Sequence, residues 1–105
     1  MFINLTPHPV TIVSQDGTKL TEIPPSGELA RLKASTVRDS EHEGIPLSKT
    51  VFGEPTGIPE YKEGVYLIVS QMIKSALPNR EDLVVPAEVV RDEKGQIIGC
   101  QSLGL

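Results

Sequence analysis

Three places in the chain carry side chains whose type and setting could do chemistry, and His8 is the first. It lies between Pro7 and Pro9, which fix the backbone on both sides and hold the imidazole in a defined direction. An imidazole held in this way can act as a base, ligate a metal or donate a hydrogen bond to an anion. The simpler interpretation, which we favour, is that the prolines end a strand and the ring bonds a backbone carbonyl.

Ser70 is the second candidate, because an apolar run from Val65 to Val69 passes at this residue into a predicted helix. The first N–H groups of such a helix point toward one place and attract anions, so Ser70 could help to hold a phosphate or a carboxylate. As a nucleophile it lacks the G-x-S-x-G surroundings, and only His8 could serve as its base. Capping of the helix is the favoured interpretation.

Arg80 and Asp82 form the third candidate. They are two residues apart on an extended segment, so their side chains are expected to point the same way. They could pair with each other, or with Arg91 and Asp92. We favour an ion pair that fixes the exit of the helix. An unpaired Arg80 in a hollow beside Ser70 would instead favour anion binding.

The pattern of potential metal ligands predicts neither a metal site nor a cofactor. His8 and His42 have no cysteine cluster or HExxH-type spacing around them. Asp39, Glu41 and Glu43 lack the glycine and the terminal bidentate glutamate of a calcium loop. A solvated acidic loop is the better interpretation of that run.

The length, charge and composition of the chain limit the classes of protein to which it can belong. The 105 residues suit one domain over residues 1–105, and the formal charge of −4 argues against unaided binding to nucleic acid. With no tryptophan, the chain offers a poor stacking platform for bases, and its one cysteine, Cys100, excludes an internal disulfide. No apolar run approaches the roughly 18 residues of a membrane span, and no signal peptide is recognisable, so we expect a soluble cytoplasmic protein.

The elements that must position these side chains are mostly short strands. The run Val65 to Val69 predicts a strand buried on both faces. Apolar residues four apart predict a short helix at about 71–77, capped by Ser70 and ended by Pro78. Strand-like stretches also lie over residues 1–5, 10–13, 19–23, 28–37, 45–52, 88–91 and 96–99, and an apolar run lies over residues 83–85. Loops are predicted over residues 38–44 and 53–64.

These elements predict an α+β chain that is mainly β, with six to seven short strands and one short helix. Nine prolines and nine glycines fit the many turns that such a chain needs. The hairpin VVRDEKGQIIGC is its clearest local feature. A small sheet covered by the helix and a small, partly open barrel both satisfy the pattern.

Three stretches of the chain, NLTPHPVTI, GVYLIVSQMIKSAL and NREDLVVPAEVVRDEKGQIIGC, together resemble a family of small proteins met in phage and prophage genomes and in some bacterial chromosomes. Members share a start like N-L-T-P-H, a middle like Y-I-V-S before a short helix, and an end like R-x-D-L-x-x-P followed by R-D-x-x-G-x-x-I-G-C. The resemblance spans nearly the whole chain and implies a phage accessory gene, counter-defence proteins included, without implying an activity. The polar positions that it matches are Asn4, Thr6, Pro7, His8, Ser70, Arg80, Asp82, Arg91 and Asp92.

We therefore expect a non-catalytic binding module that holds a small anionic, nucleotide-like ligand or a host protein, in the host cytoplasm if it is phage-encoded. The residues expected to form the ligand site are Asn4, Thr6, His8, Ser70 and Arg80. One alternative is a structural homo-oligomer built through edge strands such as Lys49 to Phe52. The other is a small nucleotide or ester hydrolase with His8 as base, ranked last because no complete catalytic constellation is visible.

Overall fold

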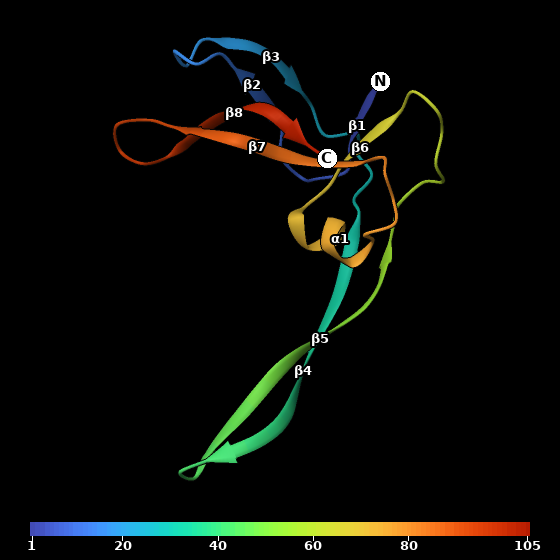
Figure 1. Ribbon diagram of the computed structural model, residues 1–105, viewed down its shortest axis with the longest axis vertical. Helices are drawn as coiled ribbons and strands as arrows, with labels where there is room; N and C mark the ends of the chain where they lie inside the picture. Colours follow the sequence, from blue (N-terminus) through green and yellow to red (C-terminus); the bar gives the residue numbers. More distant parts are fainter.

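The computed structural model describes residues 1–105, and strands make up most of its regular structure (Figure 1). The predicted class, α+β and mainly β with one short helix, is confirmed, although there are eight strands rather than six to seven. In chain order the elements are β1 (Phe2–Asn4), β2 (Val10–Val13), β3 (Lys19–Ile23), β4 (Arg31–His42), β5 (Ile45–Thr56), β6 (Tyr66–Ile68), α1 (Gln71–Ala76), β7 (Leu83–Arg91) and β8 (Ile97–Gly104).

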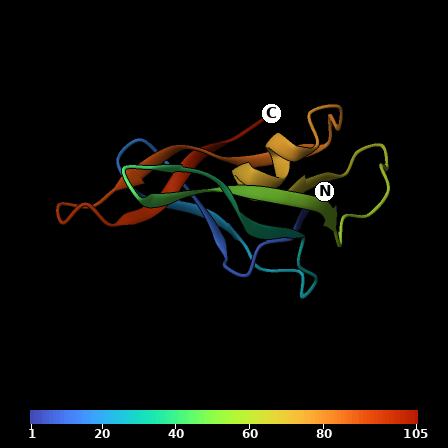
Figure 2. The same cartoon turned by 90° about the horizontal axis from the view of Figure 1, so that it is seen from below.

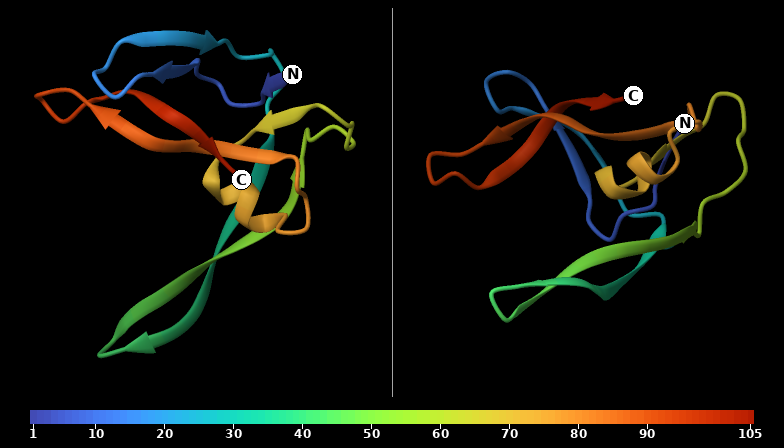
Figure 3. Two further views of the ribbon diagram at one scale, coloured as in Figure 1. Left: turned by 45° about the horizontal axis from the view of Figure 1, so that its top comes forward. Right: turned by 60° about the horizontal axis from the view of Figure 1, so that its bottom comes forward.

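Six of the strands form one curved sheet in the order β1-β6-β7-β8-β2-β3 (Figure 3). β1, β6 and β7 are parallel, with Leu67 of β6 opposite both Ile3 and Leu83. The pairs β7–β8 and β2–β3 are antiparallel hairpins, and β2 lies parallel to β8. The chain after β3 closes the remaining side, because Pro25 forms a bridge with Asn4. The sheet is thus a nearly closed barrel, one of the two predicted architectures.

The sheet has one apolar cluster on each face. Neighbouring residues of a strand point to opposite faces, so Leu67 and Ile68 of β6 belong to different clusters. The burial predicted for Val65 to Val69 is confirmed from Leu67 to Val69, which expose at most 2% of their surface, but it is wrong for Tyr66, which is 39% exposed. The inner cluster consists of Val10, Ile68, Val84 and Cys100, and the outer cluster of Leu5, Leu67, Val69, Ile73 and Leu83.

The helix α1 packs on the outer cluster through Ile73, its one buried residue. Ser70 is its N-cap, and the Ser70 hydroxyl accepts a hydrogen bond from the Ile73 backbone N–H. The helix ends at Ala76, one residue before the predicted end. Its six residues are too few for a helix that is stable alone, so α1 depends on this packing. No helix of the structure has the length and apolar character needed to cross a bilayer.

The two longest strands, β4 and β5, leave the barrel together as a separate two-stranded sheet (Figures 1 and 2). We call this hairpin, residues 31–56, the arm. The loop predicted over residues 38–44 is wrong, because residues 38–42 belong to β4 and pair with β5. The turn consists of Glu43 and Gly44, whose positive φ values of 50° and 80° are those of a type I′ hairpin turn. Because glutamate is uncommon at such a φ, the sequence does not indicate a turn at this position.

The bounds of the arm differ from the predicted strands at its base as well. β4 begins at Arg31 rather than at residue 28, and β5 continues to Thr56, beyond the predicted end at Phe52. The extra pairing between residues 31–32 and 55–56 follows a bulge, since the register shifts between Leu32 and Ala34. A bulge adds an unpaired residue and breaks the alternation that sequence patterns rely on.

Candidate functional site

Asn4 lies buried at the seam where β1 meets the chain after β3. Its side-chain amide donates to the carbonyl oxygens of His8, at 2.8 Å, and Ile23, at 3.1 Å. Its side-chain oxygen accepts from the Thr6 N–H at 2.9 Å and from the Thr6 hydroxyl at 2.6 Å. Two donors and two acceptor positions are the full capacity of an asparagine side chain. Asn4 therefore joins β1, the loop after it and the end of β3, and it has no polar group left for a ligand.

Thr6 and His8 take part in the same network. The Thr6 hydroxyl lies 3.0 Å from the His8 carbonyl oxygen and shares its proton between that atom and Asn4. The His8 side chain is exposed, and only its backbone carbonyl takes part in the network. The ring bonds no backbone carbonyl, so that interpretation of His8 is wrong. The N-L-T-P-H stretch closes the barrel through Asn4, whose amide reaches Ile23, and Thr6 bonds only Asn4 and His8. The His8 imidazole is exposed to solvent.

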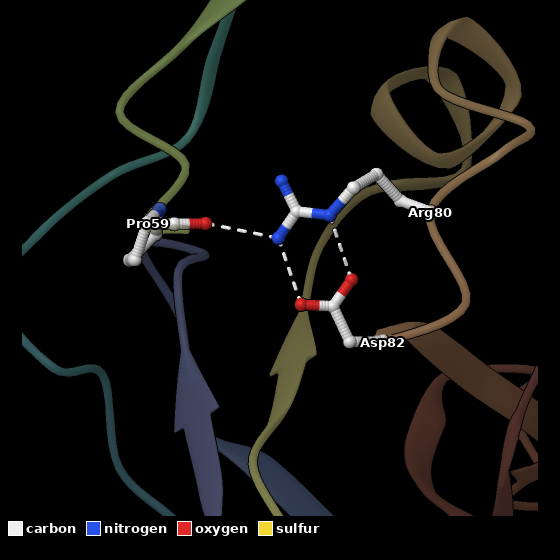
Figure 4. A network of polar contacts seen from close by, with 3 residues as sticks. All are labelled: Pro59, Arg80 and Asp82. Atoms are coloured by element: carbon white, nitrogen blue, oxygen red, sulfur yellow. Dashed lines mark hydrogen bonds and ion pairs between the residues drawn. The ribbon is translucent and has the colours of Figure 1, made fainter. Parts of the chain in front are cut away.

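Arg80 and Asp82 form the ion pair that their spacing predicts (Figure 4). The Arg80 Nε donates to Asp82 Oδ1 at 2.8 Å, and Nη2 donates to Oδ2 at 2.7 Å. Nη2 also donates to the Pro59 carbonyl oxygen at 2.9 Å. The Asp82 side chain is 2% exposed and that of Arg80 28%. The hydrogen bonds from Arg80 hold the pKa of Asp82 below its usual value, and the same contacts raise the pKa of Arg80.

A polar cavity of about 620 Å³ lies beside this ion pair. Two cations, Lys74 and Arg80, line it together with three carboxylates, Glu63, Glu81 and Asp82. Arg80 is already paired with Asp82, and Lys74 Nζ lies 3.4 Å from the Leu83 carbonyl oxygen. The cavity therefore offers an anion no surplus of positive charge.

The structure does not bring the five predicted ligand residues together. Ser70 caps the start of α1, whereas Arg80 follows its end, with the Arg80 N–H bonded to the Leu77 carbonyl at 3.1 Å. Of the predicted set, only Arg80 lines any of five cavities of the protein surface. Asn4, Thr6 and His8 form one network at the seam, apart from the polar cavity. Anion binding by the whole set stays a prediction.

The arm is a candidate binding surface that the sequence reveals only in part. Cross-strand partners lie on the same face of a hairpin, as do alternate residues of one strand. The register therefore places Val37, Ile45, Leu47 and Val51 on one face, which we call the arm face. Each of them lies opposite a polar residue on that face: Lys49, His42, Ser40 and Ser35, respectively. Each of these side chains is between 40% and 63% exposed. An ion pair between Lys49 Nζ and Asp39 Oδ1, at 3.2 Å, lies among them.

The opposite face of the arm is polar over most of its length. It carries Thr36, Arg38, Ser48 and Thr50, and only its base residue Phe52 lies beside α1, where both line a shallow groove. The alternation at residues 45, 47, 49 and 51 is the sequence signal of this two-sided arm. That alternation is typical of a strand with one face buried, yet in this chain the apolar face is not covered.

Comparison with protein-family models, with curated proteins and with solved structures finds no match for this chain. Within the chain, no group of three or more His, Cys, Asp or Glu side chains lies close enough to hold a metal ion. The geometry of the chain itself is therefore the ground for a functional proposal.

Proposed function

We propose that this protein is a non-catalytic assembly module that associates with a second copy of itself through the arm face. The observation that carries the proposal is the row of exposed apolar residues Val37, Ile45, Leu47 and Val51, which no other element of the chain covers. Of the roles expected from the sequence, this is the homo-oligomer, with the interface on one face of the arm instead of an edge strand.

The stability of the arm supports a covering partner. A two-stranded hairpin alone is at best marginally stable in water and needs a third strand or a packed surface. β4 and β5 have twelve residues each. At about 3.3 Å per residue the arm is about 40 Å long, and only its base reaches α1. Burial of apolar surface, which contributes about 25 cal/mol per Å², would stabilise the remainder.

The distribution of charge favours a second copy as the partner. Residues 31–56 contain four basic and four acidic residues, so the arm is neutral when His42 is neutral. The rest of the chain contains six basic and ten acidic residues, which places the net charge of −4 on the barrel. Two arms can therefore pack without net repulsion, while two barrels of like charge are kept apart.

The arm face is also compatible with its own copy about a twofold axis. With two arms packed antiparallel, Leu47 of one copy would face Val51 of the other, and the reverse contact would follow by symmetry. The ion pairs between Lys49 and Asp39 would lie near the axis, where they can exchange partners. An interface of this kind closes on itself, so a dimer is expected rather than a filament.

Pairing through the edge of β5, at Lys49 to Phe52, is the less favourable geometry. β5 contains Pro46 and Pro55, which lack the N–H group that an added strand would need. The apolar residues would also remain exposed after edge pairing. Packing of the two arm faces covers them directly.

The wider setting of this proposal is a phage or prophage accessory protein that acts in the cytoplasm, in the host's if it is phage-encoded. The resemblance of the three motif stretches to such proteins supports that setting. A dimer with two barrels held apart by paired arms would present two copies of the barrel surface to the host.

Sedimentation velocity over a range of protein concentrations tests the proposal. The wild-type chain of 11.4 kDa is expected to show a monomer–dimer equilibrium. The variant Leu47→Asp places a carboxylate on the arm face and is expected to weaken the dimer by tenfold or more, about 1.4 kcal/mol. Ser48→Asp introduces the same carboxylate one residue away, on the opposite face, and should associate like the wild type.

Two results would overturn the proposal. One is a wild-type chain that stays monomeric at the highest concentrations reached. The other is a Leu47→Asp variant that associates as tightly as Ser48→Asp, because the interface would then lie elsewhere.

A further inference from the structure

A second cavity, of about 530 Å³, opens at one end of the barrel and has no part in the proposed assembly. Phe2 and Tyr66 line it from the parallel strands β1 and β6, and Ile12, Ile23 and Leu103 line it from β2, β3 and β8. Its inner end is Val84 of the buried inner cluster. Small-molecule sites typically have volumes of about 300–1,000 Å³ and often lie in the mouths of β-barrels.

The barrel is open here because two of its strands part. β2 and β8 pair at one position only, Ile12 with Cys100. β2 ends at Val13, whereas β8 continues to Gly104 beside β7 alone. The part of β8 that follows Cys100 is therefore not covered by β2.

The lining of the cavity selects the chemistry of a ligand. None of its nine residues has a cationic side chain, so an anion would lose its hydration there without gaining a partner. The rings of Phe2 and Tyr66, with centroids 5.9 Å apart, form an aromatic wall. Ser102 donates its hydroxyl to Glu88, at 2.7 Å, whereas the hydroxyls of Thr21 and Tyr66 remain available to a ligand.

We propose that this cavity binds a small uncharged molecule that has a flat ring and one hydrogen-bonding group, of the class of neutral aromatic alcohols and amides. The ring would lie against Phe2 and Tyr66, where aromatic contacts add to the burial of apolar surface. The polar group would reach the hydroxyl of Thr21. Such a ligand differs in charge from the nucleotide-like anion expected from the sequence, and its site lies on the barrel rather than the arm.

A suitable probe is 2-naphthol, a neutral molecule with two fused rings and one hydroxyl. Titration of the full-length wild-type protein, followed by backbone amide NMR shifts, is expected to move the signals of Phe2, Ile12, Val84 and Leu103. Signals from residues 34–48 of the arm should stay in place. Naphthalene-2-sulfonate has the same rings and a fixed charge, and it is expected to bind about tenfold more weakly or worse.

Two tryptophan variants of β3 make a matched pair. Thr21→Trp fills the cavity and is expected to weaken 2-naphthol binding tenfold or more by calorimetry. Leu20→Trp makes a similar change on the next residue, which points to the opposite face and does not line the cavity. Since the wild-type chain has no tryptophan, the indole fluorescence of each variant reports its own site and shows whether the variant has folded.

Several results would overturn the proposal, and one of them would identify the opening as a contact between copies of the chain. Absence of NMR shifts at millimolar 2-naphthol, shifts outside the cavity, or equal binding of the sulfonate would each overturn the proposal. So would equal affinities of folded Thr21→Trp and Leu20→Trp. Loss of self-association in Thr21→Trp, with no binding of 2-naphthol to the wild type, would make the opening a contact between copies. Binding retained by the Leu47→Asp variant would show that the site is independent of the arm.

Discussion

Arg80 holds Asp82 through two parallel hydrogen bonds, Nε to Oδ1 at 2.8 Å and Nη2 to Oδ2 at 2.7 Å, and reaches Pro59 with the same Nη2 (Figure 4). The backbone carbonyl of Asp82 also accepts the Leu67 N–H at 2.8 Å, where the parallel pairing of β6 and β7 begins. The ion pair thus joins the loop before β6 to the segment between α1 and β7.

Removal of the Arg80 side chain is expected to lower the free energy of unfolding. Arg80→Ala leaves a carboxylate that is 2% exposed without its partner, and breaking a buried pair in this way costs about 3 kcal/mol of unfolding free energy. Arg91→Ala is the matched control, because Arg91 is exposed and bonds only the Gly95 carbonyl, so a change of about 0.5 kcal/mol is expected. Urea unfolding measures both. Equal losses would contradict a structural role specific to Arg80.

The ion pair between Arg80 and Asp82 makes the free energy of unfolding depend on pH. The pKa of Asp82 is lowered in the fold, first by its hydrogen bonds from Arg80, so its ionised form stabilises the native state. That contribution is complete above the unfolded-state pKa of about 3.9 and is lost as the pH falls below it toward the lower folded-state pKa. Hydrogen bonds from Ser14 and Thr18 lower the pKa of the exposed Asp16 to about 2, in the same direction.

Urea unfolding between pH 6 and pH 2 measures this dependence. Stability is expected to fall in the acid part of that range, below about pH 4. In Asp82→Asn, stability should already be lower at pH 6 and should decline less in acid, because one linked carboxylate is gone. An identical acid dependence in wild type and Asp82→Asn would show that other carboxylates cause it.

Asn4 gives a second test of a buried polar residue. Asn4→Asp keeps the shape of the side chain but removes both N–H donors, so that a carboxylate faces the carbonyl oxygens of His8 and Ile23. The loss expected at pH 7 is about 3 kcal/mol by urea unfolding. Asn79→Asp makes the same chemical change at an exposed position and should leave stability within about 0.5 kcal/mol. A tolerated Asn4→Asp would mean that this network does not hold the seam.

Substitution of Ser70 distinguishes a helix-capping role from an anion-binding role. Its hydroxyl accepts the Ile73 N–H, so Ser70→Ala is expected to cost about 1 kcal/mol of unfolding free energy. Ser75→Ala, within the same helix and exposed, should be neutral or slightly stabilising. Inorganic phosphate should shift the melting temperatures of wild type and Ser70→Ala equally. A phosphate-dependent gain in melting temperature that only the wild type shows would support the anion site predicted at Ser70.

Local signals in the sequence predict the parts of this structure that depend on near neighbours. The apolar run before Ser70 predicts a buried strand and a capped helix, and the two-residue spacing of Arg80 and Asp82 predicts their pairing. Both depend on backbone geometry over a few residues, which alternation and spacing record directly. The hairpin around Asp92 is predicted for the same reason, since the Gly95 N–H bonds the Asp92 carbonyl at 3.0 Å.

Contacts between distant residues account for what the sequence does not predict. The barrel closes because Asn4 bonds Ile23, nineteen positions away, and nothing local to either residue indicates that contact. The arm depends on a turn at Glu43 and Gly44, and the polar, acidic composition of this turn does not differ from that of the residues of β4 before it. The apolar residues of β5 are visible as an alternating pattern, but only the register shows that Val37 joins their face.

The junction between β2 and β8 yields the last prediction, at Gly99 of β8. A Cβ added there would lie 2.8 Å from the Thr11 carbonyl oxygen and 2.9 Å from Val13 Cγ1, which is closer than van der Waals contact allows. The first of these atoms belongs to the backbone of β2, so relief of the clash requires β2 to move away from β8. Ile12 and Cys100 form the single pair that joins these strands.

Gly99→Ala is therefore expected to cost about 2 kcal/mol of unfolding free energy, the usual effect of overpacking, and to speed hydrogen exchange of the β2 amides. Gly104→Ala, on the same strand, is the control, since its nearest neighbour would be Ala87 Cβ at 3.4 Å. Its effect should be small, because less backbone freedom in the unfolded chain offsets the contact. Equal effects of the two alanines on stability and on β2 exchange would show that the approach of β2 to Gly99 does not hold the barrel together.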